Sequence, residues 1–303
     1  MHRTFLVVSD IHYRLDNIKK LQIWLTQKDR LKEIDYIIAS GDLVNADYLT
    51  PLTTEKDEQE FHEVISAFQN FGKPLYYIPG NHDPDTSFLL SSDQDRKDNS
   101  KRAIDGKPIA KNFHNESLQL APGLSIVGFG GSTEGVLKNS PETVIWPACP
   151  RNTETLLSER LPILIDQVKN DDIILVTHFG PSKTGTTDVD MYPLHPSGAI
   201  ESGSKVLRDM IALRSPLLPN ESSKQYITLN IHGHSHYPFG LSHIGQTMIV
   251  NPGALRDGRF AILSLSQIDR DKLMERDKER RKYMQHFSRD KIWNLEGLEF
   301  LLI

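Results

Sequence analysis

The sequence predicts an α/β fold in which parallel strands are connected by crossover helices. The first observation is that short apolar runs alternate with helical patterns, the runs at residues 5–8, 36–39 and 75–78 and the patterns at residues 15–31 and 55–71. A strand–helix–strand order of this kind gives parallel neighbours, because the helix returns the chain to the starting edge of the sheet. The second observation is that a cluster of histidine, aspartate or asparagine closely follows each apolar run.

The helical patterns of the first half are amphipathic. In residues 55–71 the apolar side chains recur at helical spacing and form one face, which comprises Phe61, Val64, Ile65 and Phe68. Residues 84–112 break the pattern, because they are mostly polar and contain clusters of Ser, Asp, Lys and Asn. We expect this segment to be a loop insertion.

The second half continues with apolar runs and shorter helical patterns. Pro122 and Gly123 separate runs at residues 117–120 and 124–128, which indicates a hairpin. A second loop insertion is expected at residues 131–152. Helices are predicted at residues 161–168 and 204–213, and strands at residues 173–176, 226–231, 247–250 and 260–265. We therefore expect one domain over residues 1–268, followed by a highly charged helical extension over residues 269–303.

The bulk composition is ordinary for a soluble globular protein and excludes some classes of partner. The chain has 303 residues and a formal net charge of -5, from 35 Lys+Arg and 40 Asp+Glu. This balance argues against a nucleic-acid partner, because such proteins usually present a basic face. Cys149 is the single cysteine, so no intramolecular disulfide can form. No apolar run is long enough to suggest a signal peptide or a membrane span, and we expect a cytoplasmic protein without a membrane partner.

Five polar clusters carry the chemical information in this sequence. In chain order they are Asp10-Ile11-His12, Gly41-Asp42, Gly80-Asn81-His82-Asp83, Thr177-His178 and Gly233-His234-Ser235-His236. Each follows a predicted strand, and in sheets of this kind ligands collect beyond the carboxyl ends of the strands. The glycines before Asp42, Asn81 and His234 allow tight turns and close approach of the backbone.

The side chains in these clusters are metal ligands by type. Asp10 and His12 are two residues apart, so an extended segment projects both to the same side, and the same holds for His234 and His236. Carboxylate, amide and imidazole donors together suit Mn, Fe or Zn. No cluster contains cysteine, which excludes a thiolate-bound structural zinc.

The five motifs, in this order, resemble those of the calcineurin-like metallophosphoesterase superfamily. The resemblance extends from about residue 5 to about residue 265. It implies a two-sheet β-sandwich core flanked by helices, with a dinuclear metal site at the strand ends, so that residues 1–268 would form the catalytic domain.

The resemblance also implies a role for each motif residue. One ion would be held by Asp10, His12, Asp42 and His236, and the other by Asp42, Asn81, His178 and His234. A hydroxide bridging two ions of Mn, Fe or Zn would attack phosphorus in line. Asn81 would serve catalysis as well as metal binding, and His82 would contact the phosphate and protonate the leaving oxygen as general acid. Asp83 is expected to fix the turn or orient its neighbours.

Two departures point away from one branch of the superfamily. Asn45 stands where the protein Ser/Thr phosphatases have an aspartate that orients the catalytic histidine, and Asp83 stands where they have glutamate. These differences favour the phosphodiesterase-like branch. Asn45 could still hydrogen-bond to His82.

The function expected from the sequence is hydrolysis of phosphoester bonds by a phosphodiesterase or phosphatase that acts on a small, soluble, nucleotide-like substrate. One alternative is a scaffold or binding protein with an inactive site, but the ligand set and His82 are complete. Another is a nuclease, against which the net charge argues. The sequence names neither the substrate, nor the metal, nor the oligomeric state.

Some residues near the motifs are assigned to packing, although a role at the site stays open for several of them. We expect His232 to pack at a strand end, and Trp146 to pack in the core or a loop rather than to wall the pocket. The segment Asn251-Pro252-Gly253 is typical of a tight turn. His195 could contact the substrate.

Overall fold

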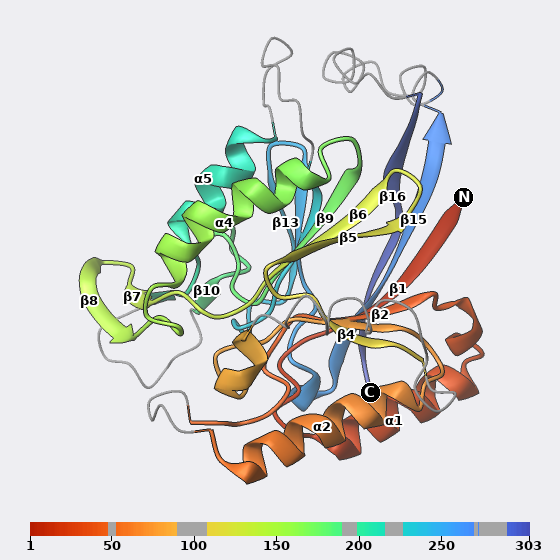
Figure 1. Cartoon of the computed structure of the whole chain (residues 1–303), viewed down its shortest axis with the longest axis horizontal. Coiled ribbons are helices and arrows are strands. Elements are labelled where there is room, and N and C mark those ends of the chain that lie inside the picture. Colours follow the sequence, from red (N-terminus) through yellow and green to blue (C-terminus); the bar gives the residue numbers. More distant parts are fainter. Residues whose placement is uncertain (48–52, 90–107, 190–198, 216–226, 270–271, 273–289) are drawn as a thin grey trace.

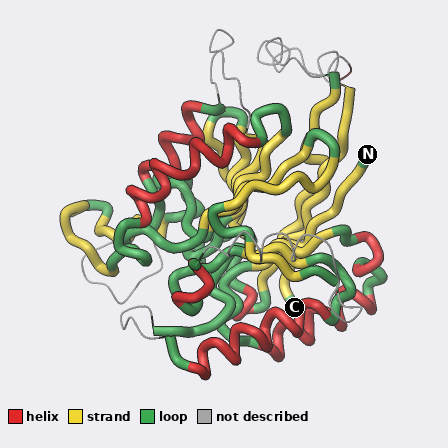
Figure 2. Tube along the Cα trace, in the orientation of Figure 1, coloured by secondary structure: helices red, strands yellow, loops and turns green. Residues whose placement is uncertain are grey.

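The computed structural model describes residues 1–47, 53–89, 108–189, 199–215, 227–269, 272 and 290–303. Two six-stranded sheets lie face to face, and a pair of helices covers the outer face of each sheet (Figure 1). Figure 2 shows the same arrangement, with the strands in the middle and the long helices on opposite sides. The α/β class and the two-sheet core flanked by helices are thereby confirmed.

The first sheet has the strand order β16-β15-β1-β2-β3-β4. Its strands are β1 (His2–Val8), β2 (Tyr36–Ala39), β3 (Leu75–Tyr77), β4 (Ala110–Asn112), β15 (Arg259–Asp269) and β16 (Lys291–Leu302). Strands β1 to β4 are parallel, and β15 runs antiparallel to both β1 and β16. Helix α1 (Leu15–Gln27) connects β1 to β2, and α2 (Glu55–Gln69) connects β2 to β3. The predicted strand–helix alternation is therefore correct.

The second sheet has the strand order β13-β14-β12-β9-β6-β5. Its strands are β5 (Glu116–Ala121), β6 (Leu124–Phe129), β9 (Asp172–Thr177), β12 (Ile227–Ile231), β13 (Gly240–Ile244) and β14 (Thr247–Asn251). Strands β6, β9, β12 and β14 are parallel, and β5 and β6 form the predicted hairpin. Helices α4 (Thr153–Gln167) and α5 (Lys205–Leu213) cover its outer face (Figure 1).

A smaller sheet lies beside the sandwich. It has the order β10-β11-β7-β8, and its strands are β7 (Gly135–Leu137), β8 (Ser140–Trp146), β10 (Asp188–Val189) and β11 (Ile200–Glu201). The described 3₁₀ helices are η1 (Leu31–Glu33), η2 (Asp85–Phe88) and η4 (Leu255–Asp257). None of the helices in the described residues is long and apolar enough to cross a lipid bilayer.

Strand β1 shows why the apolar runs are continuous rather than alternating. Phe5 and Val7 pack between the two sheets, whereas Leu6 and Val8 pack under helices α1 and α2. A strand covered on both faces needs apolar side chains at every position. Helix α2 is amphipathic instead, because only one of its faces meets the sheet. It begins with a capping box in which the Thr54 hydroxyl accepts from the N–H of Asp57.

The predicted helical extension at residues 269–303 is wrong for residues 291–302, which form strand β16. This strand pairs with β15 along its whole length, from Lys291 opposite Asp269 to Leu302 opposite Arg259. A register shift between Ser264 and Leu265 interrupts the pairing. The shift breaks the period-two pattern that would have indicated a strand. The most highly charged part of the predicted extension, residues 275–282, lies outside the described residues.

The two predicted loop insertions also contain short strands. Residues 84–112 include η2 and β4, and residues 131–152 contain the β7–β8 hairpin that precedes α4. β4 and β7 have three residues each, which is too few for a recognisable period. Part of the first insertion, residues 90–107, lies outside the described residues, as does His195.

The C-terminal strand contributes to stability through Trp293. Its side chain is 2% exposed, its Nε1 donates to the carbonyl oxygen of Pro122 at 3.1 Å, and its backbone N–H donates to Asp172 Oδ2 at 2.7 Å. We expect Trp293→Ala to lower the free energy of unfolding by about 3–5 kcal/mol, the usual cost of truncating a buried tryptophan. Urea denaturation measures this, with Leu302→Ala on the same strand, 66% exposed, as control. Equal effects of the two substitutions would show that this strand is not part of the folded core.

Candidate metal centre

The predicted ligands come together where strand ends of both large sheets meet. Strands β1, β2 and β3 of the first sheet end just before Asp10, Asp42 and Asn81, and strands β9 and β12 of the second sheet end just before His178 and the 233–236 loop. The sequence predicted that each cluster follows its own strand. The packing of the two sheets is what places the clusters beside one another.

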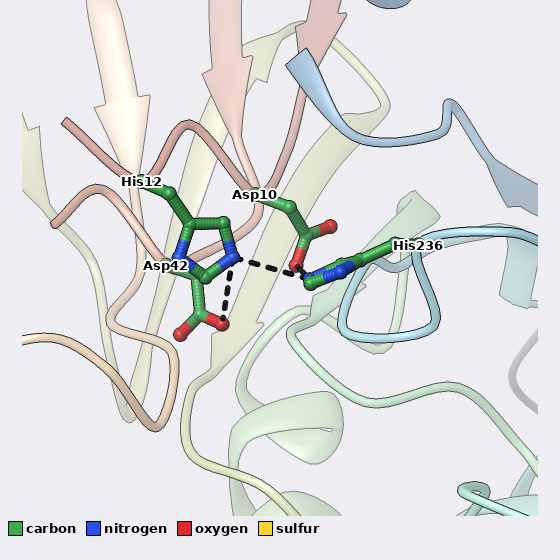
Figure 3. Close-up of side chains that lie close together, drawn as sticks. All are labelled: Asp10, His12, Asp42 and His236. Carbon is green, nitrogen blue, oxygen red and sulfur yellow. Dashed lines mark hydrogen bonds and ion pairs between the residues drawn. The ribbon is translucent and has the colours of Figure 1, made fainter. Parts of the chain in front are cut away.

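The first group of side chains is Asp10, His12, Asp42 and His236, whose ligand atoms all lie within 4.8 Å of one another (Figure 3). His12 Nε2 lies 3.1 Å from His236 Nε2 and 3.7 Å from Asp42 Oδ2. His236 Nε2 lies 3.2 Å from Asp10 Oδ1. Two carboxylates and two imidazoles therefore converge on one small volume, as ligands of a single cation do.

The second group is Asp42, His178 and His234, whose ligand atoms also lie within 4.8 Å of one another. His178 Nε2 lies 3.3 Å from Asp42 Oδ1 and 3.2 Å from the amide oxygen of Asn81, so Asn81 adjoins this group. Asp42 belongs to both groups: Oδ2 faces His12 and Oδ1 faces His178. A carboxylate in this position can bridge two cations.

Hydrogen bonds behind the cluster fix the orientation of two imidazoles. His178 Nδ1 donates to the carbonyl oxygen of Ser40 at 2.7 Å, and His12 Nδ1 donates to Asn45 Oδ1 at 2.7 Å. Each bond turns Nε2 toward the cluster, which is the usual way in which proteins orient metal-binding histidines.

The position of Asn45 corrects one expectation. Its Oδ1 accepts from His12 Nδ1 and its Nδ2 donates to the carbonyl oxygen of His12, so it orients a predicted ligand instead of His82. His82 Nδ1 donates to the carbonyl oxygen of Ala46 at 3.2 Å. The sequence could not distinguish these partners, because the turn that follows β2 decides which histidine Asn45 faces.

The electrostatics of the cluster favour cations. Burial would raise the pKa of Asp10, but the charge of His236 and its hydrogen bond outweigh burial and lower that pKa. Burial likewise opposes ionisation of Asp42, yet the charges of His178 and His82 hold its pKa well below the usual range. Burial would lower the pKa of His178, but the charge of Asp42 raises it to about 9. These buried carboxylates thus stay ionised and attract positive charge, either a proton on a neighbouring imidazole such as His178 or a metal ion, and metal binding would displace that proton.

The backbone is strained at the predicted ligands. Four of them have positive φ values, in the left-handed region that residues other than glycine rarely adopt. They are Asp10 (51°), His12 (49°), Asp42 (53°) and His234 (65°). Such conformations cost about 1–3 kcal/mol each and concentrate at functional sites. Gly80 is required for a different reason, because a Cβ there would lie 2.1 Å from Asp42 Oδ1.

Asp83 joins two of the loops that carry predicted ligands. Its Oδ1 accepts from the N–H groups of Leu43 at 2.7 Å and Val44 at 3.0 Å, and its Oδ2 accepts from the N–H of Gly80 at 2.8 Å. Burial and the neighbouring charge of Asp42 raise the pKa of Asp83 to about 7. These contacts agree with the expected orienting role.

Asn251 has a role beyond the turn that was expected for it. Its Oδ1 accepts from the N–H of Gly253 at 2.9 Å, which is the turn, while its Nδ2 donates to the carbonyl oxygen of Ser235 at 2.8 Å. Ser235 lies between His234 and His236, so Asn251 also holds the loop that carries both. His232, as expected, is buried at the strand end, with Nε2 2.9 Å from the hydroxyl of Thr186.

A cavity of about 360 Å³ opens over the cluster. Its lining comprises Asp42, Asn81, His82, Trp146, Ser202, His234, Ser235, His236, Tyr237 and Arg256. Trp146 therefore walls the pocket, contrary to the expectation of simple packing. Ser202 and Tyr237 are lining residues that sequence reasoning missed. The position of Tyr237 directly after His236 was the signal that could have revealed it.

The residues present fit a two-ion centre. The donor set consists of carboxylate, amide and imidazole groups, which suits first-row transition metals. Within the described part of the chain, His234 Nε2 is buried and has no hydrogen-bond partner. An unpaired buried nitrogen is unfavourable in a folded protein unless something else satisfies it, and a metal ion would.

Comparisons with known proteins bear on the family and the fold of this chain. Residues 3–238 match the sequence model of the calcineurin-like phosphoesterase family. A comparison with curated proteins yields no match. One solved structure is 20% identical, with a TM-score of 0.56, and the alignment covers 87% of this chain and 95% of the other. The crystal structure of TT1561 of Thermus thermophilus is 17% identical, with a TM-score of 0.53 over 87% of this chain and 94% of the other. A dimetal phosphatase from Danio rerio is 11% identical, with a TM-score of 0.49 over 86% of this chain and 92% of the other.

Proposed function

The chain belongs to the calcineurin-like phosphoesterase family, and we propose that it hydrolyses phosphate esters with two transition-metal ions held at the strand ends. The observation that carries the proposal is the sharing of Asp42 between two groups of ligand atoms, each within 4.8 Å. The proposed ligands are Asp10, His12, Asp42 and His236 for one ion, and Asp42, Asn81, His178 and His234 for the other. Mn, Fe and Zn are the proposed metals, because these donors suit them.

Bound at these side chains, two such ions would lower the pKa of a coordinated water and would neutralise charge on the attacking and leaving oxygens. The residues of the chain itself position the reacting groups and supply the proton for the leaving oxygen. His82 lines the cavity, and its backbone N–H donates to Asp42 Oδ1 at 2.8 Å, which ties the loop after β3 to the shared carboxylate. We assign His82 the transfer of a proton to the leaving oxygen, and Asn81 a role as ligand next to it.

The proposed substrate is a small, soluble phosphate ester of the nucleotide type. A volume of about 360 Å³ is at the small end of the range for ligand pockets, which supports a compact substrate over a polymer. The net charge of -5 likewise gives no support to a nucleic-acid substrate. Asn45 and Asp83 distinguish the chain from the protein phosphatases, which supports phosphodiester chemistry.

The proposal is tested by assaying purified protein after it has been stripped of metal and reloaded with Mn, Fe, Co or Zn. Hydrolysis of bis-(p-nitrophenyl) phosphate and of p-nitrophenyl phosphate is followed at each metal content. We expect turnover that depends on loading and reaches its maximum near two ions per chain. The absence of turnover with every metal would indicate a scaffold or binding protein instead.

Asn45 provides a finer test of the ligand assignment. Asn45→Ala removes the acceptor that orients His12, and we expect metal affinity at the first group to fall about 10–100-fold, as is usual for such partners. Titration with Mn and Zn, monitored by calorimetry, measures the effect. Asn45→Asp retains an acceptor for His12 Nδ1 and should keep affinity within a few-fold. An equal loss in both variants would mean that Asn45 acts through the fold of its loop.

A further inference from the structure

One wall of the cavity comes from the small sheet, which contributes none of the proposed metal ligands. Trp146 is the last residue of β8, is partly exposed and lines the cavity together with Asp42 and His82. Its ring centroid lies 6.1 Å from that of His234, and the two ring planes are inclined by 75°. The indole therefore stands beside the second ligand group, within the space that a phosphate ester would enter.

Gly135 holds the indole in place. It pairs with Trp146 across the β7–β8 hairpin. A Cβ at Gly135 would lie 2.1 Å from Cε2, 2.3 Å from Cζ2 and 2.5 Å from Cδ2 of the indole. These atoms surround the fused bond of the ring, so the Gly135 backbone lies against one ring face. One face of the ring is thus covered by backbone, and the ring is held before any ligand arrives.

A second aromatic side chain lines the same cavity. Tyr237 directly follows His236 of the first ligand group and is 42% exposed. The cavity thus combines a cluster suited to metal-assisted phosphate chemistry with aromatic side chains next to each ligand group. Alkyl and simple sugar phosphates have no planar π-face that could stack on an aromatic side chain, whereas a nucleobase has one.

Resting on the proposed function, we propose that Trp146 determines substrate specificity by stacking against a planar aromatic group of the ester, as in a nucleotide. Stacking of a base on an aromatic side chain is sequence-tolerant, because every base has a π-face. Since Gly135 restrains the ring, little conformational entropy is lost when a base binds. The competing explanation is that Trp146 only covers the glycine across the hairpin, a known structural use of aromatic residues in sheets.

Two ligands that differ only by the base separate these explanations. Adenosine 5′-monothiophosphate and ribose 5-monothiophosphate carry the same thiophosphate group and resist hydrolysis. Their binding to the metal-loaded protein is measured by calorimetry. We expect the adenosine compound to bind about 10-fold more tightly or better, in line with stacking on an aromatic side chain. Trp146→Leu, which still covers Gly135 with an apolar side chain, should bring this ratio close to one. Trp146→Phe should preserve most of it.

A matched control is Phe239→Leu, because Phe239 is an exposed aromatic residue (44%) that does not line the cavity. It should keep the wild-type ratio. A ratio near one in the wild type, a ratio that survives Trp146→Leu, or no measurable binding of the adenosine compound would each overturn the proposal. Turnover of bis-(p-nitrophenyl) phosphate is recorded separately. Turnover without base-dependent binding rejects only the stacking role, and base-dependent binding without turnover rejects only hydrolysis.

Discussion

Asp42→Ala is expected to abolish tight binding of both metal ions and nearly all phosphoesterase activity. Its two carboxylate oxygens face different ligand groups, at 3.7 Å from His12 Nε2 and 3.3 Å from His178 Nε2, so a single truncation removes a ligand from each. Two ions contribute several kcal/mol of charge stabilisation in the transition state. We therefore expect kcat to fall by about 1,000-fold or more, since each 1.36 kcal/mol is a factor of ten.

The measurement for Asp42→Ala is elemental analysis of the purified variant together with its rate on bis-(p-nitrophenyl) phosphate. Circular dichroism and thermal unfolding show whether the variant folds, since Asp42 Oδ1 also accepts from the backbone N–H of His82. Asp10→Ala is the matched comparison, because Asp10 belongs to the first group alone and its loss should leave one ion bound. A folded Asp42→Ala protein that retains two ions would contradict the bridging assignment.

His82→Ala is expected to separate metal binding from catalysis. His82 belongs to neither group of ligand atoms but lines the cavity, so both ions should remain while the proton donor is lost. General acid catalysis usually contributes about 10²–10⁴-fold. We expect a loss of that size for esters with alkoxide leaving groups, and a much smaller loss for p-nitrophenyl esters, because p-nitrophenolate leaves without protonation.

A series of esters with leaving groups of graded pKa provides the measurement for His82→Ala. The slope of log kcat against leaving-group pKa should become steeper in the variant, while the metal content stays at the wild-type value. Full activity on alkyl esters would exclude His82 as the general acid. Loss of metal from the variant would instead assign His82 a structural role in the cluster.

The core elements of the fold were predictable because their signals are local. The apolar runs of β1, β2, β3 and β9 and the amphipathic face of α2 follow from burial at each position. Strand β16 was not predictable, because a register shift within the β15–β16 pairing hides its period and only the folded sheet supplies its partner. The hairpin that carries Trp146 is short and partly exposed, so its composition resembles that of a loop.

The candidate site likewise has features that the sequence predicted and features that it did not. The resemblance carried by the motif residues implied a two-metal centre with Asp42 as the shared ligand, and the structure brings these residues together. The hydrogen-bond partner of Asn45 was predicted wrongly, because the choice between His12 and His82 depends on the path of one turn. Ser202 was missed because nothing in its sequence neighbourhood indicates that it lies at the cavity, whereas Tyr237 was missed although it directly follows His236.

By itself, the sequence determined which donor groups this protein offers, in which order, and that each follows a strand. These are properties of residue type and short spacing, which the chain carries before it folds. Only the tertiary structure decided that the predicted ligands, which follow strands of two different sheets, converge within 4.8 Å in each group. It also decided that four of them have strained backbone, and that Trp146 and Tyr237 line the same cavity. The reason is physical. Convergence depends on how two sheets pack, and packing is set by buried contacts between residues that are far apart along the chain.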